Sequence, residues 1–160
     1  MNQRVALPTR SRTGAPEPRR ALKGFTLIEV MVTIAIVAIL AAIGYPNYSD
    51  YVRRGNVQEA PSSLSNYRAQ LEQRYQDHRT YDKGDGTCGI DPPGTTKNFQ
   101  YSCTLANSGQ GYSLAATGRT GTTVSGLEYK LNQRNQPSTT CTSCAWNFSG
   151  EQSSWVMRKP

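Results

Sequence analysis

Hydrophobic and polar residues follow two helical patterns in the first half of this chain. An apolar run from Phe25 to Tyr45, in which Glu29 is the only formal charge, predicts a helix long enough to cross a hydrocarbon core of ~30 Å. Farther on, apolar residues recur every three or four positions, which indicates an amphipathic helix: Tyr48, Tyr51, Val52, Leu64, Tyr67, Leu71 and Tyr75. We therefore expect one helix from Phe25 to about His78, some 80 Å long at 1.5 Å per residue.

Two prolines and a glycine interrupt these patterns. Pro46 cannot donate a backbone hydrogen bond, so we expect a helix kink there. Gly55 and Pro61 weaken the helix over 55–62, where Pro61 should break one hydrogen bond or mark a bend.

The second half of the chain changes to a period of two. Residues 81–96 have the Gly, Pro and Asp density of a loop. Short alternating runs then predict four strands, identified by these residues: Phe99, Tyr101, Cys103 and Leu105; Tyr112, Leu114 and Ala116; Leu127, Tyr129 and Leu131; Trp155 and Met157. Residues 107–111 and 118–126 look like hairpin connections. The expected fold class is α+β, with the long N-terminal helix packed on a four-stranded antiparallel sheet.

The net charge of +7 belongs mostly to the first 24 residues. These hold one acidic residue, Glu17, and six basic ones: Arg4, Arg10, Arg12, Arg19, Arg20 and Lys23. The remaining chain has twelve Lys/Arg and ten Asp/Glu, so the isoelectric point is no sign of nucleic-acid binding by the rest. A basic segment before an apolar helix predicts a cytoplasmic N-terminus, with everything after Tyr45 outside the inner membrane. A secretory signal peptide and a plain single-pass anchor are the alternatives.

The boundary between the two segments reads KGFTLIEV, from Lys23 to Val30. This motif, followed by an unbroken apolar helix, is similar to the processing and methylation signature of type IV prepilins and of the related type II secretion pseudopilins. The fragments TCGIDPP, FQYSC and GYSLAATG resemble the heads of minor pilins from Gram-negative bacteria. The resemblance implies the pilin fold, and thus a helix half embedded in a small head and half free.

The resemblance also implies roles for individual residues. Prepilin peptidase would cut between Gly24 and Phe25, and the new amine of Phe25 would then be N-methylated. Glu29 is costly in an apolar helix, on the order of 3 kcal/mol, and therefore needs a partner. In the family that partner is the N-terminal amine of a neighbouring subunit, which makes Glu29 an assembly residue. Alternatively, Glu29 reaches the lipid headgroups as an interfacial residue.

Four cysteines lie on the side predicted to be exported: Cys88, Cys103, Cys141 and Cys144. An oxidising compartment favours disulfides, and a head of about 80 residues needs such staples. Of the three pairings we favour Cys88 with Cys103 and Cys141 with Cys144, while a crossed pattern stays open. A zinc site or a redox CxxC is less consistent with the spacing.

Catalytic motifs are not found in the sequence. His78 is the only histidine, and we interpret it as a surface or helix-end residue. We expect no enzyme, no cofactor and no metal site.

The resemblance implies a pilus subunit, and specifically a minor pilin. We expect it to polymerise through its N-terminal helix into a surface filament for adhesion, twitching motility or DNA uptake. Its partners would be other pilin subunits, the inner membrane before assembly, prepilin peptidase and the pilus assembly platform. A type II secretion pseudopilin is one alternative. The expected organisation is a cleaved leader at 1–24, a transmembrane and assembly segment at 25–45, an amphipathic half-helix at 46–80 and a stapled β head at 81–160.

A DNA-receptor pilin is the other alternative, and it needs a basic patch on the head. Candidate phosphate-binding residues are Arg119, Lys130, Arg134, Arg158 and Lys159, with Trp146, Trp155 or Tyr129 for stacking. Because the chain after Gly24 has a net charge of only +2, scattered solubilising charge is the favoured interpretation of these residues.

Overall fold

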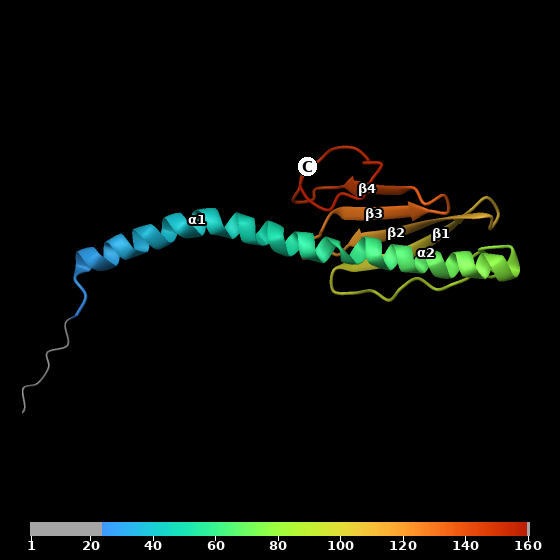
Figure 1. The fold of residues 1–160 in the computed structure, drawn as a ribbon, viewed down its shortest axis with the longest axis horizontal. Coiled ribbons are helices and arrows are strands. Elements are labelled where there is room, and N and C mark those ends of the chain that lie inside the picture. Colours follow the sequence, from blue (N-terminus) through green and yellow to red (C-terminus); the bar gives the residue numbers. More distant parts are fainter. Residues whose placement is uncertain (1–23, 160) are drawn as a thin grey trace, which may run out of the picture. The chain divides into compact units, whose positions relative to one another are not determined.

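Two helices in tandem are followed by a four-stranded antiparallel sheet in the computed structural model, which describes residues 24–159 (Figure 1). The elements are α1 (Leu27–Val57), α2 (Glu59–His78), β1 (Phe99–Ala106), β2 (Gly111–Gly118), β3 (Leu127–Asn132) and β4 (Pro137–Cys141). Contacts divide the chain into two compact units between Ile39 and Leu40. The fold class predicted from the sequence is confirmed. Apart from Gly24, the predicted leader lies outside the described residues.

The predicted long helix is present from Leu27 to His78, and an interruption at Gln58 divides it into α1 and α2. Pro61 explains the interruption, because proline has no N–H to donate to the carbonyl of Val57 and its ring crowds that oxygen. The break thus falls within 55–62, as predicted. α1 continues through Pro46, where Asn47 Nδ2 donates to the carbonyl of Ile43 at 3.0 Å. A kink at Pro46 stays a prediction.

α2 ends where the backbone turns into the left-handed region. Arg79 has φ 59°, and its N–H donates to the carbonyl of Tyr75 at 2.8 Å. His78 is the last residue of α2 and is exposed, as expected of a helix-end residue.

Strands follow one another in the sheet in chain order, β1-β2-β3-β4, each antiparallel to the next. Tyr101, Ala116, Tyr129 and Thr139 lie opposite one another across the four strands. The prediction of a strand at Trp155 and Met157 is wrong, since the fourth strand is Pro137–Cys141. Its sequence PSTTC has no alternating apolar residues, and only Thr139 is buried, so the period-two signal is missing.

The core lies between α2 and the sheet. Leu64, Tyr67 and Leu71 of α2 are at most 1% exposed, and α2 contacts β2 and β3. The first half of the predicted stripe is not in this core, because Tyr48 and Tyr51 are 68% and 76% exposed. The lengths of the elements give a reason. An eight-residue strand spans about 26 Å, and the 20 residues of α2 already rise about 30 Å, so the sheet is not long enough to cover α1 as well.

Two carboxylates of α2 bind groups outside the helix. Glu72 accepts hydrogen bonds from the Tyr112 hydroxyl at 2.7 Å and the Tyr81 hydroxyl at 3.1 Å, and Glu59 accepts one from Asn98 Nδ2 at 2.9 Å. Burial, followed by the hydrogen bond to Glu72, raises the pKa of Tyr81 to about 12, and the same two causes raise the pKa of Tyr112. Both hydroxyls therefore stay protonated donors at neutral pH.

The chain after β4, which we call the C-terminal tail (142–159), returns to the sheet. Thr139 and Gln152 exchange two backbone hydrogen bonds of 2.9 Å, and Thr139 Oγ1 donates to the carbonyl of Ser154 at 2.9 Å. Farther along, the carbonyl of Val156 accepts a hydrogen bond of 2.7 Å from the Tyr129 hydroxyl. The tail thus pairs with the outer edge of β4. An edge strand without such cover could pair with another chain. We use the word head for α2, the sheet and the tail together.

Candidate functional site

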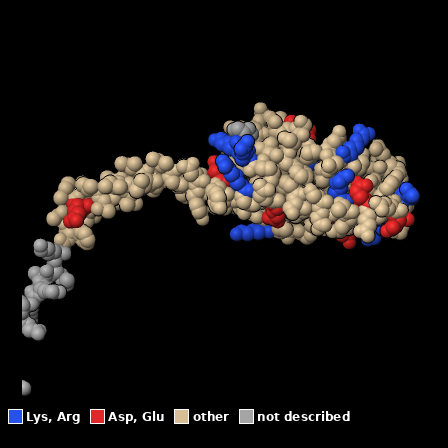
Figure 2. Space-filling view, viewed as in Figure 1, with Lys and Arg blue, Asp and Glu red and all other residues tan. Residues whose placement is uncertain are grey.

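The apolar stretch of α1, residues 27–43, has no apolar partner in the described chain. Its large hydrophobic side chains are between 49% and 78% exposed. An 18-residue window of this helix has a mean hydropathy of 2.6, enough in length and composition to cross a membrane. Figure 2 shows a long surface almost free of charge along this helix. Such a surface is unstable in water and needs lipid or other protein around it.

Three residues at the start of α1 form the predicted processing and assembly site. Gly24 and Phe25 precede the helix, and Phe25 is 82% exposed. Thr26 caps the helix, since its Oγ1 accepts a hydrogen bond from the backbone N–H of Glu29 at 3.2 Å. Glu29 lies in the first turn, where a negative charge is favourable, and forms no ion pair within residues 24–159.

The basic residues predicted to bind DNA do not form one patch. Arg119 donates to the backbone carbonyl of Thr96 at 2.9 Å, and Lys130 forms an ion pair of 2.9 Å with Glu128. Arg134 lies in the turn between β3 and β4, while Arg158 lines a hollow with Arg54 and Trp155. Figure 2 shows Lys and Arg at several separate places on the head, with Asp and Glu between them.

Two of the three predicted stacking residues cannot stack, which corrects that expectation. Tyr129 is fully buried because it lies on the face of β3 that packs against α2, and Trp146 is only 3% exposed. Trp155 is partly exposed, and its indole N–H donates to the carbonyl of Lys130 at 3.2 Å. Trp155 is therefore the predicted aromatic residue that remains accessible.

Seven basic side chains of the described residues have neither an ion pair nor a side-chain hydrogen bond. They are Arg54, Arg79, Lys83, Lys97, Arg134, Arg158 and Lys159. These side chains are available to a polyanion.

Both disulfides favoured from the sequence are present. Cys88 pairs with Cys103, which ties the loop after α2 to β1, and Cys141 pairs with Cys144. The second bond lies in a tight turn against Gly126, whose carbonyl accepts a hydrogen bond from Thr142 N–H at 2.8 Å. Gly126 has φ +79°, and a Cβ there would come within 2.3 Å of the Thr142 carbonyl oxygen. Only glycine fits this approach.

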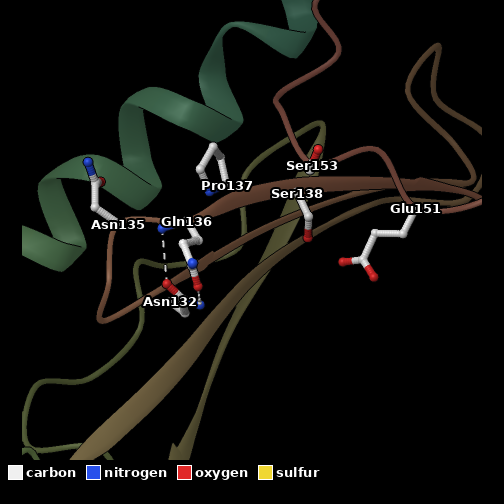
Figure 3. Close-up of a pocket in the computed structure, with 7 residues that line it drawn as sticks. All are labelled: Asn132, Asn135, Gln136, Pro137, Ser138, Glu151 and Ser153. Atoms are coloured by element: carbon white, nitrogen blue, oxygen red, sulfur yellow. Dashed lines mark hydrogen bonds between the residues drawn. The ribbon is translucent and has the colours of Figure 1, made fainter.

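A shallow polar pocket lies between the β3–β4 turn and the tail (Figure 3). It is lined by Asn132, Asn135, Gln136, Pro137, Ser138, Glu151 and Ser153. Asn132 uses its amide on Gln136, so part of this polar surface stabilises the turn itself. No predicted site residue lines the pocket, and residues 24–159 contain no group of His, Cys, Asp and Glu able to hold a metal ion.

Two family models match the sequence and together cover residues 19–144. Residues 19–45 match the prokaryotic N-terminal methylation motif. Residues 46–144 match the model described as type IV minor pilin ComP, DNA uptake sequence receptor, which is more than half of the chain. The chain belongs to this type IV minor pilin family. Its resemblance to type IV prepilins, read from KGFTLIEV, is thereby confirmed.

Relatives of this minor pilin chain include pilus proteins. It is 42% identical over 67 residues to the type IV major fimbrial protein FimA of Dichelobacter nodosus, covering 42% of each chain. Identity to the type IV major pilin protein PilE1 of Neisseria gonorrhoeae is 40% over 71 residues, covering 44% of this chain and 43% of that protein. Prepilin peptidase-dependent protein D of Escherichia coli is 42% identical over 76 residues, covering 47% and 52%. The chain thus matches about half or less of the length of these relatives.

Two solved structures are similar to the minor pilin chain. A type IV pilin from Shewanella oneidensis has a TM-score of 0.46 and 16% identity, covering 53% of this chain and 89% of that one. The non-core minor pilin PilV of Neisseria meningitidis has a TM-score of 0.49 and 17% identity, covering 60% and 94%.

Two features of the site were missed from the sequence. The cap Thr26 and the carboxylate Glu29 have the spacing T-x-x-E of a capping box, which was a readable signal. The bonds from Tyr81 and Tyr112 to Glu72 had no such signal, because the partners are 9 and 40 residues away.

Proposed function

We propose that this minor pilin is made as an inner-membrane precursor, processed after Gly24 and then assembled into a type IV filament with other pilin subunits. The observation that supports this most is the exposed apolar stretch of α1 with one carboxylate, Glu29, in its first turn. The stretch contacts lipid before assembly and packs against the helices of neighbouring subunits afterwards. The N-terminus is cytoplasmic in the precursor, and the head is on the outer side. The filament serves adhesion, twitching motility or DNA uptake, and the subunit is structural, not an enzyme.

Processing prepares the contact that orders the subunits. Cleavage by prepilin peptidase frees the amine of Phe25, and N-methylation leaves that amine positively charged. Glu29 of one subunit then pairs with the Phe25 amine of its neighbour among packed helices. In such a low-dielectric setting a charge without a partner is strongly penalised, so the pair fixes the register of the helices. Apolar packing supplies most of the association energy.

Substitution of Glu29 tests the assembly step. Glu29→Ala removes the charge, so the precursor still inserts and is still cleaved, but the amount of the chain in sheared filaments falls sharply. Glu29→Gln keeps the shape and loses the charge, and the fall is expected again. The matched control is Thr33→Ala, one turn along the same helix, which should assemble normally. Normal amounts of processed Glu29→Gln in filaments would show that the ion pair does not direct assembly.

Processing is tested separately at Gly24. A Cβ at Gly24 would meet no atom within 4 Å, so the fold itself does not require glycine there. Close approach of the peptidase to the backbone is the requirement that we propose. Gly24→Leu should therefore leave intact precursor in the membrane, detected by its larger mass. Mature-length protein from this variant would contradict recognition at this position.

DNA binding by the head is the second candidate function. The family whose model matches residues 46–144 is described as a DNA uptake sequence receptor, and the head has basic side chains without ion pairs. We propose that Arg158 and Lys159 bind phosphates of duplex DNA, with Trp155, which lines the same hollow as Arg158, as the accessible aromatic residue. Each phosphate contact contributes about 0.9 to the slope of log K against log salt.

The test measures binding of fluorescent duplex DNA by the processed full chain in detergent at several salt concentrations. Arg158→Gln with Lys159→Gln should reduce the salt slope by about 1.8, which is two phosphate contacts. Glu151→Gln is the control, because it changes charge in the same tail without removing a cation. Binding without a salt slope, or an unchanged slope in the double variant, would exclude these contacts.

A further inference from the structure

Three tyrosines on α1 form an exposed stripe that the fold does not use. Tyr45, Tyr48 and Tyr51 are 77%, 68% and 76% exposed. They are spaced three residues apart, so they lie near one face of the helix. The helical period groups Tyr48 and Tyr51 with the core residues of α2, but the fold leaves both exposed, so another environment accounts for them.

The stripe begins where the apolar stretch ends. Leu40 and Ile43 are 65% and 63% exposed, and Tyr45 comes two residues later. After Glu29 the next formal charge is Asp50, followed by Arg53, which pairs with it. The tyrosines thus lie along α1 between a segment suited to hydrocarbon and a segment suited to water.

Lengths along the helix agree with this order. The 18 residues Leu27–Gly44 rise about 27 Å, close to a hydrocarbon core of ~30 Å. The rise from Tyr45 to Tyr51 is about 9 Å, comparable with a headgroup layer of roughly 5–8 Å on one side of a bilayer. Tyrosine has an apolar ring and a polar hydroxyl, and it is enriched at this depth in membrane proteins.

We infer that the tyrosine stripe binds the outer headgroup layer of the inner membrane and sets the depth of α1 before assembly. This inference rests on the proposed membrane insertion of the precursor and names the lipid contact that positions it. The stripe holds the helix so that Asp50 and the head stay in water. A neighbouring pilin helix is the other occupant that the face could take, and it is favoured if the stripe of the unassembled chain lies outside the lipid.

Depth is measured by fluorescence quenching of the unassembled full chain in phosphatidylcholine–phosphatidylglycerol vesicles. Tryptophan is introduced one site at a time as Ile34→Trp, Tyr48→Trp or Gln70→Trp, and the emission of the unsubstituted chain is subtracted. The vesicles contain lipid brominated either at the shallower carbons 6 and 7 of the acyl chain or at the deeper carbons 11 and 12. Tyr48→Trp should be quenched more by the shallow bromine, and Ile34→Trp more by the deep one. Gln70→Trp, on the exposed face of α2, should be quenched by neither.

The outcomes separate this inference from the proposed function. If Ile34→Trp is not quenched at all, the helix is not inserted and both fail. If Ile34→Trp is quenched while Tyr48→Trp is not, the helix spans the bilayer but the stripe lies outside it, and only the inference is overturned.

An anchoring role is tested in the same vesicles with the Ile34→Trp probe. Replacing all three tyrosines by serine should change the ratio of deep to shallow quenching at position 34, because the helix is free to shift. Replacing them by tryptophan, which favours the same layer, should keep the ratio. An unchanged ratio in the serine variant would overturn the role of the stripe in setting depth.

Discussion

The two helices of this minor pilin contain similar apolar side chains in opposite environments. Leu40 of α1 is 65% exposed, whereas Leu64 of α2 is fully buried against the sheet. Burial of Leu64 is complete within one chain, so α2 contributes to the stability of the head. Leu40 is not buried by the rest of the described chain, so lipid or another protein is needed to remove its apolar surface from water. The comparison shows that one apolar pattern forms the core of the head, while the other is left exposed and open to lipid or to another protein.

The largest expected effect tests this comparison with one substitution at both sites. Leu64→Ala should lower the free energy of unfolding of the head by about 2–5 kcal/mol, because it leaves a cavity in the core. Leu40→Ala should leave it unchanged. Both are measured by denaturant unfolding of the processed chain in detergent, followed by tryptophan fluorescence. Equal losses at the two sites would remove the distinction.

Much of this division was predictable from the sequence, because the two apolar patterns differ. An unbroken apolar run predicted the exposed stretch of α1, and the period of Leu64, Tyr67 and Leu71 predicted the buried face of α2. The break at Gln58 followed from Pro61. Local chemistry also gave the two disulfides as the favoured pairing, although other pairings stayed open.

The errors have physical reasons too. Tyr48 and Tyr51 share the helical period of the core residues, and periodicity alone does not reveal where the sheet ends. β4 was missed because Thr139, its buried residue, is polar and is satisfied by the carbonyl of Ser154 and the N–H of Val156. Pairs far apart in sequence, such as Glu72 with Tyr112, depend on the tertiary fold.

The next largest effect concerns the staples of the head. Cys88→Ser with Cys103→Ser opens a loop whose closure is worth about 3 kcal/mol in the chain-entropy model. Cys141→Ser with Cys144→Ser should cost less, about 2 kcal/mol, because its loop is much shorter. Denaturant unfolding of the two double variants shows which one loses more stability. A larger loss from the CTSC pair would mean that strain or packing, not loop length, decides the effect.

A smaller effect is expected at the carboxylate that joins α2 to the sheet. Glu72→Gln leaves one carbonyl oxygen for two tyrosine hydroxyls, so one of them loses its acceptor. The expected loss is about 1–2 kcal/mol in the free energy of unfolding. Gln73→Ala, an exposed neighbour on α2, is the control. No loss in Glu72→Gln would show that water replaces the carboxylate at these hydroxyls.

The last effect is a dependence of the stability of the head on alkaline pH. The pKa values of Tyr67 and Tyr81 are raised to about 12, first by burial. A tyrosine in the unfolded chain loses its proton near pH 10, while the folded head retains it. Stability is therefore full below pH 10 and falls as the pH rises toward 12. Tyr81→Phe should make the fall shallower in brief alkaline unfolding experiments, and an equally steep fall would contradict this assignment.

Processing and assembly are tested most directly by mass spectrometry of filaments sheared from the bacterium that makes this chain. We expect a chain that begins at Phe25, has one added methyl group on that residue, and contains two disulfides. Glu29→Gln should reduce its amount in the filaments without changing that N-terminus in the membrane pool. Filaments without the chain, or a filament chain that retains residues before Phe25, would contradict the central claim that processing at Gly24 prepares this pilin for assembly.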